Sequence, residues 1–148
     1  HIKNLVIDDW QYMSSFEYFD RADEKGYDKF TSIAKNLAQV AKLPKDMRED
    51  LYIFFLTHSE ESTDVNGHRK VKAKTVGKMI DNALTLEGLF SIVLFGKVVK
   101  TEDDKLSYVF ETTNNGENTC KSPDGMFENA RISNSLKLVK NAIIEYEN

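Results

Sequence analysis

The chain has 148 residues, of which 41% are hydrophobic and 30% are charged, with two prolines and seven glycines. This length and composition fit one globular domain and exclude collagen-like, low-complexity and wholly disordered chains. No apolar run reaches the roughly 18 residues that a membrane span needs, and the first residues lack the basic-then-apolar pattern of a signal peptide. We therefore expect a soluble, cytoplasmic protein with no membrane partner.

Charge and cysteine content narrow the function classes further. The formal net charge is −4, so the surface as a whole does not predict nucleic-acid binding. Cys120 is the single cysteine and cannot form an internal disulfide, and the three histidines lack the spacing of zinc ligands. We expect no structural metal, and we assign Cys120 no role.

The first half of the chain predicts two strands and two helices. Residues 2–7 are apolar and β-branched and end at an acid pair, which indicates a short buried strand. Residues 10–19 are rich in aromatic side chains and can start a helix, and residues 27–43 carry apolar side chains at helical spacing before Pro44. The apolar run 51–56 predicts a second strand, buried between helices.

The second half predicts a mixture of loops, helices and a hairpin. Residues 59–74 read as a polar loop with an Asn66-Gly67 turn, followed by a helix over 75–86 that Thr75 could cap. Two β-rich runs, 89–99 and 106–112, flank a charged turn and predict an antiparallel hairpin. Residues 114–125 read as a loop, and 132–146 as a final amphipathic helix capped at Ser133 or Asn134.

The order of these elements predicts a fold class. Apolar strands that alternate with helices are typical of an α/β protein with a largely parallel sheet flanked by helices. The hairpin would then add an antiparallel pair at one edge of that sheet. We find no internal repeat, and we expect residues 1–148 to form a single domain.

The acid pair Asp8-Asp9 is the most informative feature for function. It follows the apolar residues Leu5, Val6 and Ile7 directly. Ligands of open α/β sheets bind beyond the carboxyl ends of the strands, and Mg²⁺ is a common way to relieve the repulsion between adjacent carboxylates. The pattern predicts a metal site at Asp8, with a strand that ends in a solvated turn as the alternative.

Two families place an acid pair at this position. A response-regulator receiver also needs a phospho-accepting Asp at the end of the next central strand, where this chain has Thr57. The segments NLVIDDWQYM, GYDKFTSIAK, YIFFLTHSEE, KVKAKTVGKMID and KSPDGMFE, with the hairpin between the last two, cover nearly the whole chain. In this order they resemble the second half of phage-encoded RecA/AAA-type P-loop ATPases associated with recombination or replication. The resemblance implies a partial RecA-like core.

The resemblance implies roles for residues at the two strand ends. Asp8, as part of the Walker B element, would bind Mg²⁺ through its water shell, and Asp9 would polarise the attacking water. His58 stands at the sensor position and would bond to the γ-phosphate or to that water. Because many relatives carry Glu where this chain has Asp9, Glu60 or Glu61 is an alternative base. A histidine bonded to loop backbone is the alternative for His58.

Other cations would act between subunits or on DNA. Lys121 resembles the position from which a neighbour's cation reaches the γ-phosphate across a ring interface, with Arg131 as the alternative. The loop over residues 62–74 lies where RecA-type rings place their DNA-contacting loops, so its basic segment would bind the backbone of single-stranded DNA. A solvated basic face is the alternative. The residues of this basic segment are Arg69, Lys70, Lys72 and Lys74.

The phosphate-binding Walker A motif G-x-x-x-x-G-K-[ST] does not occur in the sequence. The chain also opens on an apolar run without an initiator Met. We therefore expect it to be the part of a larger ATPase that runs from Walker B to the C-terminus. It would bind ATP and Mg²⁺ only in the complete protein, in the cytoplasm of a phage host, and be inactive alone.

The main alternative is a non-catalytic module that binds nucleic acid or drives oligomerisation through its own surface. Strands that lack apolar partners must be covered, so we expect a homo-oligomer. The aromatic group in residues 10–19 favours core packing or a subunit contact over base stacking. Its members are Trp10, Tyr12, Phe16, Tyr18 and Phe19.

Overall fold

The structure is a computed structural model that describes residues 1–75 and 85–148. By its internal contacts the chain forms two compact units. Unit 1 comprises His1–Glu60 and Lys72–Phe90, and unit 2 comprises Glu61–Val71 and Ser91–Asn148. Most of the helix expected over 75–86, including the residues that would follow a Thr75 cap, lies outside the described residues. Within the described ranges, no helix has the length and apolar character needed to cross a membrane.

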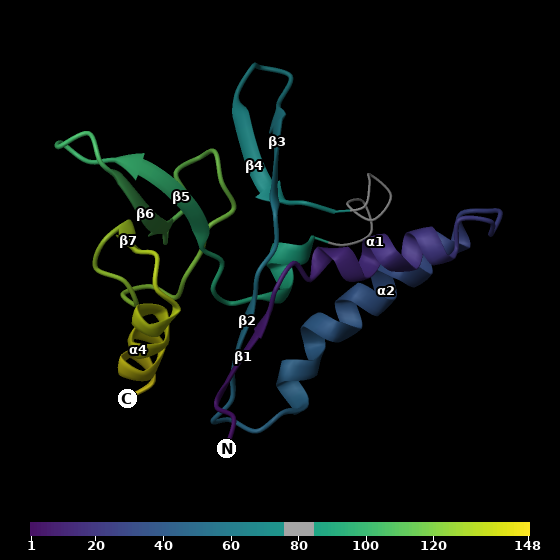
Figure 1. The fold of residues 1–148 in the computed structure, drawn as a ribbon, viewed down its shortest axis with the longest axis horizontal. Coiled ribbons are helices and arrows are strands. Elements are labelled where there is room, and N and C mark those ends of the chain that lie inside the picture. Colours follow the sequence, from purple (N-terminus) through teal and green to yellow (C-terminus); the bar gives the residue numbers. More distant parts are fainter. Residues whose placement is uncertain (76–84) are drawn as a thin grey trace. The chain divides into compact units, whose positions relative to one another are not determined.

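Unit 1 contains a pair of parallel strands joined through two helices (Figure 1). Strand β1 (Asn4–Ile7) pairs with β2 (Tyr52–Phe55) in a register that places Asn4 opposite Tyr52 and Ile7 opposite Phe55. Helices α1 (Gln11–Asp20) and α2 (Asp28–Lys42) lie between them in the chain and pack on each other. Short 3₁₀ helices follow at η1 (Leu43–Asp46) and η2 (Leu86–Leu89). The strands and helices predicted for residues 2–56 are thus confirmed, but the predicted burial of the two strands is wrong, because β1 is largely exposed and β2 is half-buried.

The core of unit 1 forms around Trp10, which is 2% exposed. Its ring meets the edge of Phe55 at a centroid distance of 5.2 Å and that of Phe90 at 5.9 Å. Helix α2 contributes Leu37 and Ala41 to the same cluster, because these residues fall on one face of the helix. The packing role predicted for the aromatic group therefore holds for Trp10. In contrast, Tyr12, Phe16 and Phe19 are exposed on α1.

Residues 59–74 do not form the predicted loop. They form a two-stranded hairpin of β3 (Ser59–Thr63) and β4 (Arg69–Ala73). The Asp64 carboxylate accepts hydrogen bonds from the backbone N–H groups of Asn66 and His68 at 2.8 and 2.9 Å. Gly67 takes the left-handed conformation that the turn requires, with φ of 83°. The predicted turn at Asn66-Gly67 is therefore confirmed. The two strands were not predicted, because most of their side chains are polar.

Unit 2 contains a three-stranded antiparallel sheet and the last helix. Strand β6 (Leu106–Glu111) lies between β5 (Phe95–Lys100) and β7 (Arg131–Ser133). The pairing of β5 with β6 confirms the predicted hairpin, whereas β7 was not predicted. Helix α4 (Leu136–Glu147) begins after Ser135, and no side chain caps it. The predicted caps at Ser133 and Asn134 are therefore wrong.

The predicted fold class is also wrong. We expected an α/β protein with a largely parallel sheet flanked by helices, an antiparallel edge hairpin and a partial RecA-like core. The described residues instead form three small sheets, of which only the β1–β2 pair is parallel. In the β5–β6 hairpin, β6 pairs with β5 on one side and with β7 on the other. The hairpin therefore belongs to a separate sheet and is not the edge of the parallel pair. Sequence periodicity identified strands but could not assign their partners.

Candidate functional site

The acid pair lies in the turn between β1 and α1. Strand β1 ends at Ile7, and the backbone N–H of Trp10 donates a hydrogen bond to the carbonyl of Leu56, at the end of β2, over 3.1 Å. This bond ties the start of α1 to the neighbouring strand. The chain reverses sharply at Asp9, whose φ of 50° is in the left-handed region that a short polar residue tolerates better than a bulky one. Asp8 and Asp9 thus stand at the carboxyl end of the parallel pair.

The structure brings Asp9 and His58 together. Nε2 of His58 lies 3.3 Å from Oδ1 of Asp9, and both side chains are about half exposed. This contact follows from the parallel pairing, because the residues after β1 and those after β2 emerge at the same edge. The ring of Tyr12 stands edge-on to His58 at a centroid distance of 6.3 Å. The pair is thus in contact and open to solvent.

Asp8 has a different environment from its neighbour. Its side chain is exposed and makes no hydrogen bond or ion pair with any described residue. Mg²⁺ in phosphoryl-transfer sites is held by one or two carboxylates, with waters and substrate phosphates completing the shell. An exposed carboxylate at a strand end fits that requirement. In the described ranges no group of three His, Cys, Asp or Glu side chains is placed so that it could hold a metal ion by itself.

The residues present do not fit ATP by themselves. The triphosphate needs a loop of backbone amides and a lysine, and the sequence contains no G-x-x-x-x-G-K-[ST] motif. The two alternative bases are also engaged elsewhere. Glu60 pairs with Lys72 at 3.0 Å, and Glu61 is bound by both ends of the Arg69 guanidinium. The hydrogen bonds from Arg69 lower the pKa of Glu61, which makes it a weaker base.

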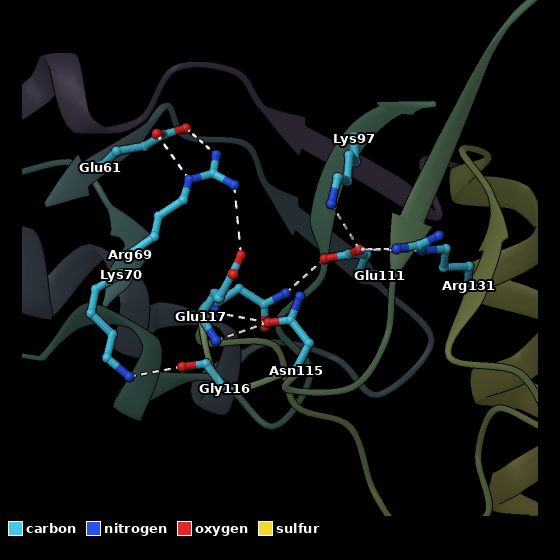
Figure 2. A network of polar contacts seen from close by, with 10 residues as sticks. Glu61, Arg69, Lys70, Lys97, Glu111, Asn115, Gly116, Glu117 and Arg131 are labelled. Carbon is cyan, nitrogen blue, oxygen red and sulfur yellow. Dashed lines mark hydrogen bonds and ion pairs between the residues drawn. The ribbon is translucent and has the colours of Figure 1, made fainter. Parts of the chain in front are cut away.

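Arg69 and Lys70 of β4 both contact neighbouring residues of the chain (Figure 2). Arg69 binds Glu61 and lies 3.6 Å from Glu117, and Lys70 donates a hydrogen bond to the carbonyl of Gly116 at 2.7 Å. Lys72 pairs with Glu60, as described above. Lys74 is exposed and makes no side-chain contact within the described ranges. The β3–β4 hairpin therefore carries both acidic and basic side chains, several of them in ion pairs.

Both residues considered as trans-acting cations belong to unit 2, whereas Asp8, Asp9 and His58 belong to unit 1. Lys121 forms a β-bridge with Val93 through its backbone, which leaves its side chain exposed. Arg131 lies on β7 and donates hydrogen bonds from Nε and NH2 to Glu111. Its guanidinium is thus held by a carboxylate of its own chain.

Glu111 is the centre of a polar network that sequence reasoning missed (Figure 2). Its side chain is 5% exposed, and Oε1 accepts from Arg131 at 3.0 Å and from Lys97 at 3.4 Å. Oε2 accepts from the side-chain amide of Asn118 at 2.8 Å. Burial raises the pKa of Glu111, but the Arg131 hydrogen bond and the Lys97 charge outweigh burial, so the pKa is lowered overall. Glu111 is therefore a charged, fully partnered group.

The network could have been found from the register, had β7 been predicted. Glu111 pairs with Arg131 across β6 and β7, and Lys97 lies diagonally across β5 on the same face. Asn118 continues the network to Cys120, because its side-chain oxygen accepts the Cys120 backbone N–H at 3.1 Å. Burial raises the pKa of the Cys120 thiol to about 11, which makes it unreactive at neutral pH.

No protein-family model matches the sequence, and no curated protein and no solved structure is significantly similar to it. A functional assignment therefore depends on the chemistry of the residues and on their geometry.

Proposed function

We propose that this chain carries the metal-binding and water-orienting residues of an ATP-hydrolysing site in a phage recombination or replication ATPase that acts on single-stranded DNA. The observation that supports the proposal is the 3.3 Å contact between Asp9 and His58, with the exposed Asp8 beside it. The three side chains stand at the carboxyl end of two parallel strands, where such sites bind their ligands.

The three side chains have distinct roles in this proposal. Asp8 holds Mg²⁺, which when bound neutralises charge on phosphate oxygens. Oδ1 of Asp9 lies 3.3 Å from Nε2 of His58, and when the site binds its substrate Asp9 would accept a hydrogen bond from Nε2, which would fix the tautomer of the imidazole. Nδ1 of His58 is then an acceptor that can orient a water molecule. Asp9 and His58 would thus position the attacking water, as the general-base role requires.

Metal binding can be tested on the 148-residue chain. Mn²⁺ in place of Mg²⁺ should broaden the backbone NMR signals around Asp8 and Asp9, and Asp8→Asn should remove this effect. Asp23→Asn is the matched control, because Asp23 is an exposed acid of the same unit. Equal broadening in the wild type and in Asp8→Asn would contradict the metal site.

Hydrolysis requires a phosphate-binding loop that this sequence does not contain. The encoding reading frame should therefore be sequenced upstream of His1 and searched for a Walker A motif. In a protein that joins such a loop to this chain, Asp8→Asn should abolish ATP turnover while leaving the circular dichroism spectrum unchanged. The 148-residue chain alone should not hydrolyse ATP. Turnover by this chain that Asp8→Asn removes would contradict the need for a separate loop.

DNA binding through the β3–β4 hairpin requires phosphates to replace the present partners of Arg69, Lys70 and Lys72. Exposed ion pairs contribute at most about 1 kcal/mol each, so this exchange is energetically accessible. We expect weak, sequence-independent binding that falls with salt. Replacing the four basic residues with Gln should reduce affinity and the salt dependence. Replacing Lys25, Lys35, Lys42 and Lys45 with Gln gives the same change in net charge and should have little effect.

An oligomeric assembly is the second candidate function, and the exposed apolar side chains of unit 1 favour it. Phe16 and Phe19 are 65% and 70% exposed on α1, and Leu5 and Val6 are exposed on β1. Surfaces of this kind are covered in the functional state of most proteins. We propose that the chain forms homo-oligomers. Sedimentation velocity over a wide concentration range tests this, and a monomer at every concentration would contradict it.

A further inference from the structure

Strand β1 has one edge that no described strand covers, because the sheet consists of β1 and β2 alone in the part of the chain that the structure describes. The carbonyls of Lys3 and Ile7 accept hydrogen bonds from the N–H groups of Tyr52 and Leu56, at 3.0 and 2.9 Å. Odd-numbered residues therefore direct their backbone groups toward β2. The alternation of a strand then directs the N–H and C=O groups of Asn4 and Val6 to the open edge.

Both faces of β1 are also partly open, although Ile7 packs against the core cluster around Trp10. Leu5 and Val6 point to opposite faces, because successive side chains of a strand alternate, and they are 39% and 46% exposed. Parallel strands are normally covered on both faces. From Asn4 to Ile7 the strand contains no proline and no charge, two of the features that prevent an edge from pairing with another strand.

We propose that the open edge of β1 pairs with β1 of a second copy, in antiparallel orientation about a two-fold axis. Charge complementarity at the strand ends selects this occupant. The strand is preceded by Lys3 and followed by Asp8 and Asp9. Antiparallel pairing places the cationic end of one copy beside the acidic end of the other. Parallel pairing would place acid beside acid and Lys3 beside Lys3.

The hydrogen-bonding alternation restricts the register. Residues that face the open edge must lie opposite residues that also face it, so Val6 can lie opposite Asn4 or opposite Val6 of the second copy. Of these two registers, Val6 opposite Val6 is the one that sets Lys3 of one copy opposite the acid pair of the other, at Asp9. Leu5 then lies opposite Ile7, and Asn4 opposite Asp8. The side-chain amide of Asn4 can donate to the Asp8 carboxylate, which retains acceptor sites for a cation. The result is a four-stranded sheet in the order β2, β1, β1, β2.

Lys3 can exchange its present partner for the new contact. It lies 3.5 Å from Asp50, and both side chains are about half exposed, so that ion pair contributes little. The inference uses only the edge of β1 and the charges that flank it. It therefore does not rest on the proposed ATPase activity. Because the shared edge is short, we expect a weak dimer that dissociates on dilution.

Val6→Pro tests the edge directly. Proline removes the outward N–H of residue 6, whereas pairing with β2 uses the odd-numbered residues, so the unit should remain folded. Sedimentation velocity should give a concentration-dependent dimer for the wild type and dimerisation about tenfold weaker or more for Val6→Pro. Val6→Thr keeps the N–H and is the matched control, which should still dimerise. A wild type that remains monomeric, or a Val6→Pro variant that dimerises equally well, would overturn the proposal.

Charge exchange gives a second test if Val6→Pro does not fold. Asn4→Asp should weaken the dimer, because in this register it places an acid opposite Asp8 of the second copy, and Asp8→Lys alone removes the acceptor of the Asn4 amide. The double variant Asn4→Asp/Asp8→Lys should restore the dimer, because opposite charges then lie opposite each other. Both positions are exposed, so the fold should be unaffected. A double variant that associates no better than either single variant would overturn the register. Loss of association in Phe16→Ser/Phe19→Ser with no effect of Val6→Pro would show that α1, and not β1, forms the contact.

Discussion

Glu111 and the Asp8-Asp9 pair are carboxylates at strand ends, in surroundings of opposite kinds. Glu111 closes β6 in unit 2, is almost fully buried, and has a hydrogen-bond donor for each oxygen. Asp8 and Asp9 follow β1 in unit 1 and are open to solvent, with His58 as the one side-chain partner in the described part of the chain. The same chemical group thus occurs in two opposite environments in one small protein.

The difference indicates what each carboxylate can do. A buried charge is tolerated only when its partners replace water, so removing it leaves those partners unsatisfied. An exposed carboxylate remains hydrated and can exchange water for a cation. Glu111 is therefore suited to hold three strands and a loop together, and Asp8 to bind a ligand.

The largest expected effect is on stability at Glu111. Glu111→Ala removes the acceptor of Arg131, Lys97 and the buried amide of Asn118. The two cations are partly exposed and can regain water, so we expect a loss of about 2 kcal/mol in the free energy of unfolding. Urea denaturation measures it. Glu117→Ala is the control, because its exposed pair with Arg69 should contribute less than about 1 kcal/mol. Equal losses of unfolding free energy in Glu111→Ala and Glu117→Ala would show that the buried carboxylate stabilises the fold no more than an exposed one.

The second expected effect is on the pH dependence of stability. The pKa of Glu111 is below its ordinary value of 4.5 in the folded chain. Its contribution is therefore fully present above about pH 4.5 and is lost as the pH falls from there through the folded pKa. Glu111→Gln should flatten the decline of melting temperature with pH in that range. A decline that is unchanged in Glu111→Gln would assign the acid sensitivity to other carboxylates.

The third expected effect is on the accessibility of Cys120. This buried thiol is linked to Glu111 through Asn118, and it is the one cysteine of the chain. Thiol reagents should label the native protein slowly, because the thiol is buried and its pKa is about 11. Glu111→Gln should speed labelling by loosening Asn118, whereas Asp8→Asn should not. Fast labelling of the wild type would show that the network is already open.

Much of the local structure could be predicted from sequence, because it depends on patterns within one segment. Apolar runs identified β1 and β2, and helical spacing identified α2. In β3 and β4 most side chains are polar and exposed, so no apolar alternation marked the strands. The three residues of β7 are too few for any periodicity. The sheet arrangement depends on partners distant in the chain, which local patterns do not specify.

The same distinction explains which parts of the candidate site were predicted. Asp9 and His58 each lie just beyond the end of an apolar strand, so one assumption about parallel pairing was enough to place them together. Glu111 and Arg131 come together only through β7, which lies 20 residues further along the chain. The acidic and basic residues of the hairpin looked like separate segments in the sequence. The β3–β4 pairing turned them into ion pairs.

The smallest expected effects are at Asp9, where backbone conformation and ligand chemistry can be separated. Because φ at Asp9 is 50°, a β-carbon there is strained, and glycine relieves that strain. Asp9→Gly should therefore be as stable as the wild type or more stable, Asp9→Asn about equal, and Asp9→Ala less stable by about 1 kcal/mol. The exposed contact with His58 contributes too little to reverse this order. Thermal unfolding measures the series. If instead Asp9→Gly and Asp9→Ala lost the same stability, the carboxylate would itself stabilise the fold. The acid pair would then resemble Glu111, and the case for a ligand site at this strand end would weaken.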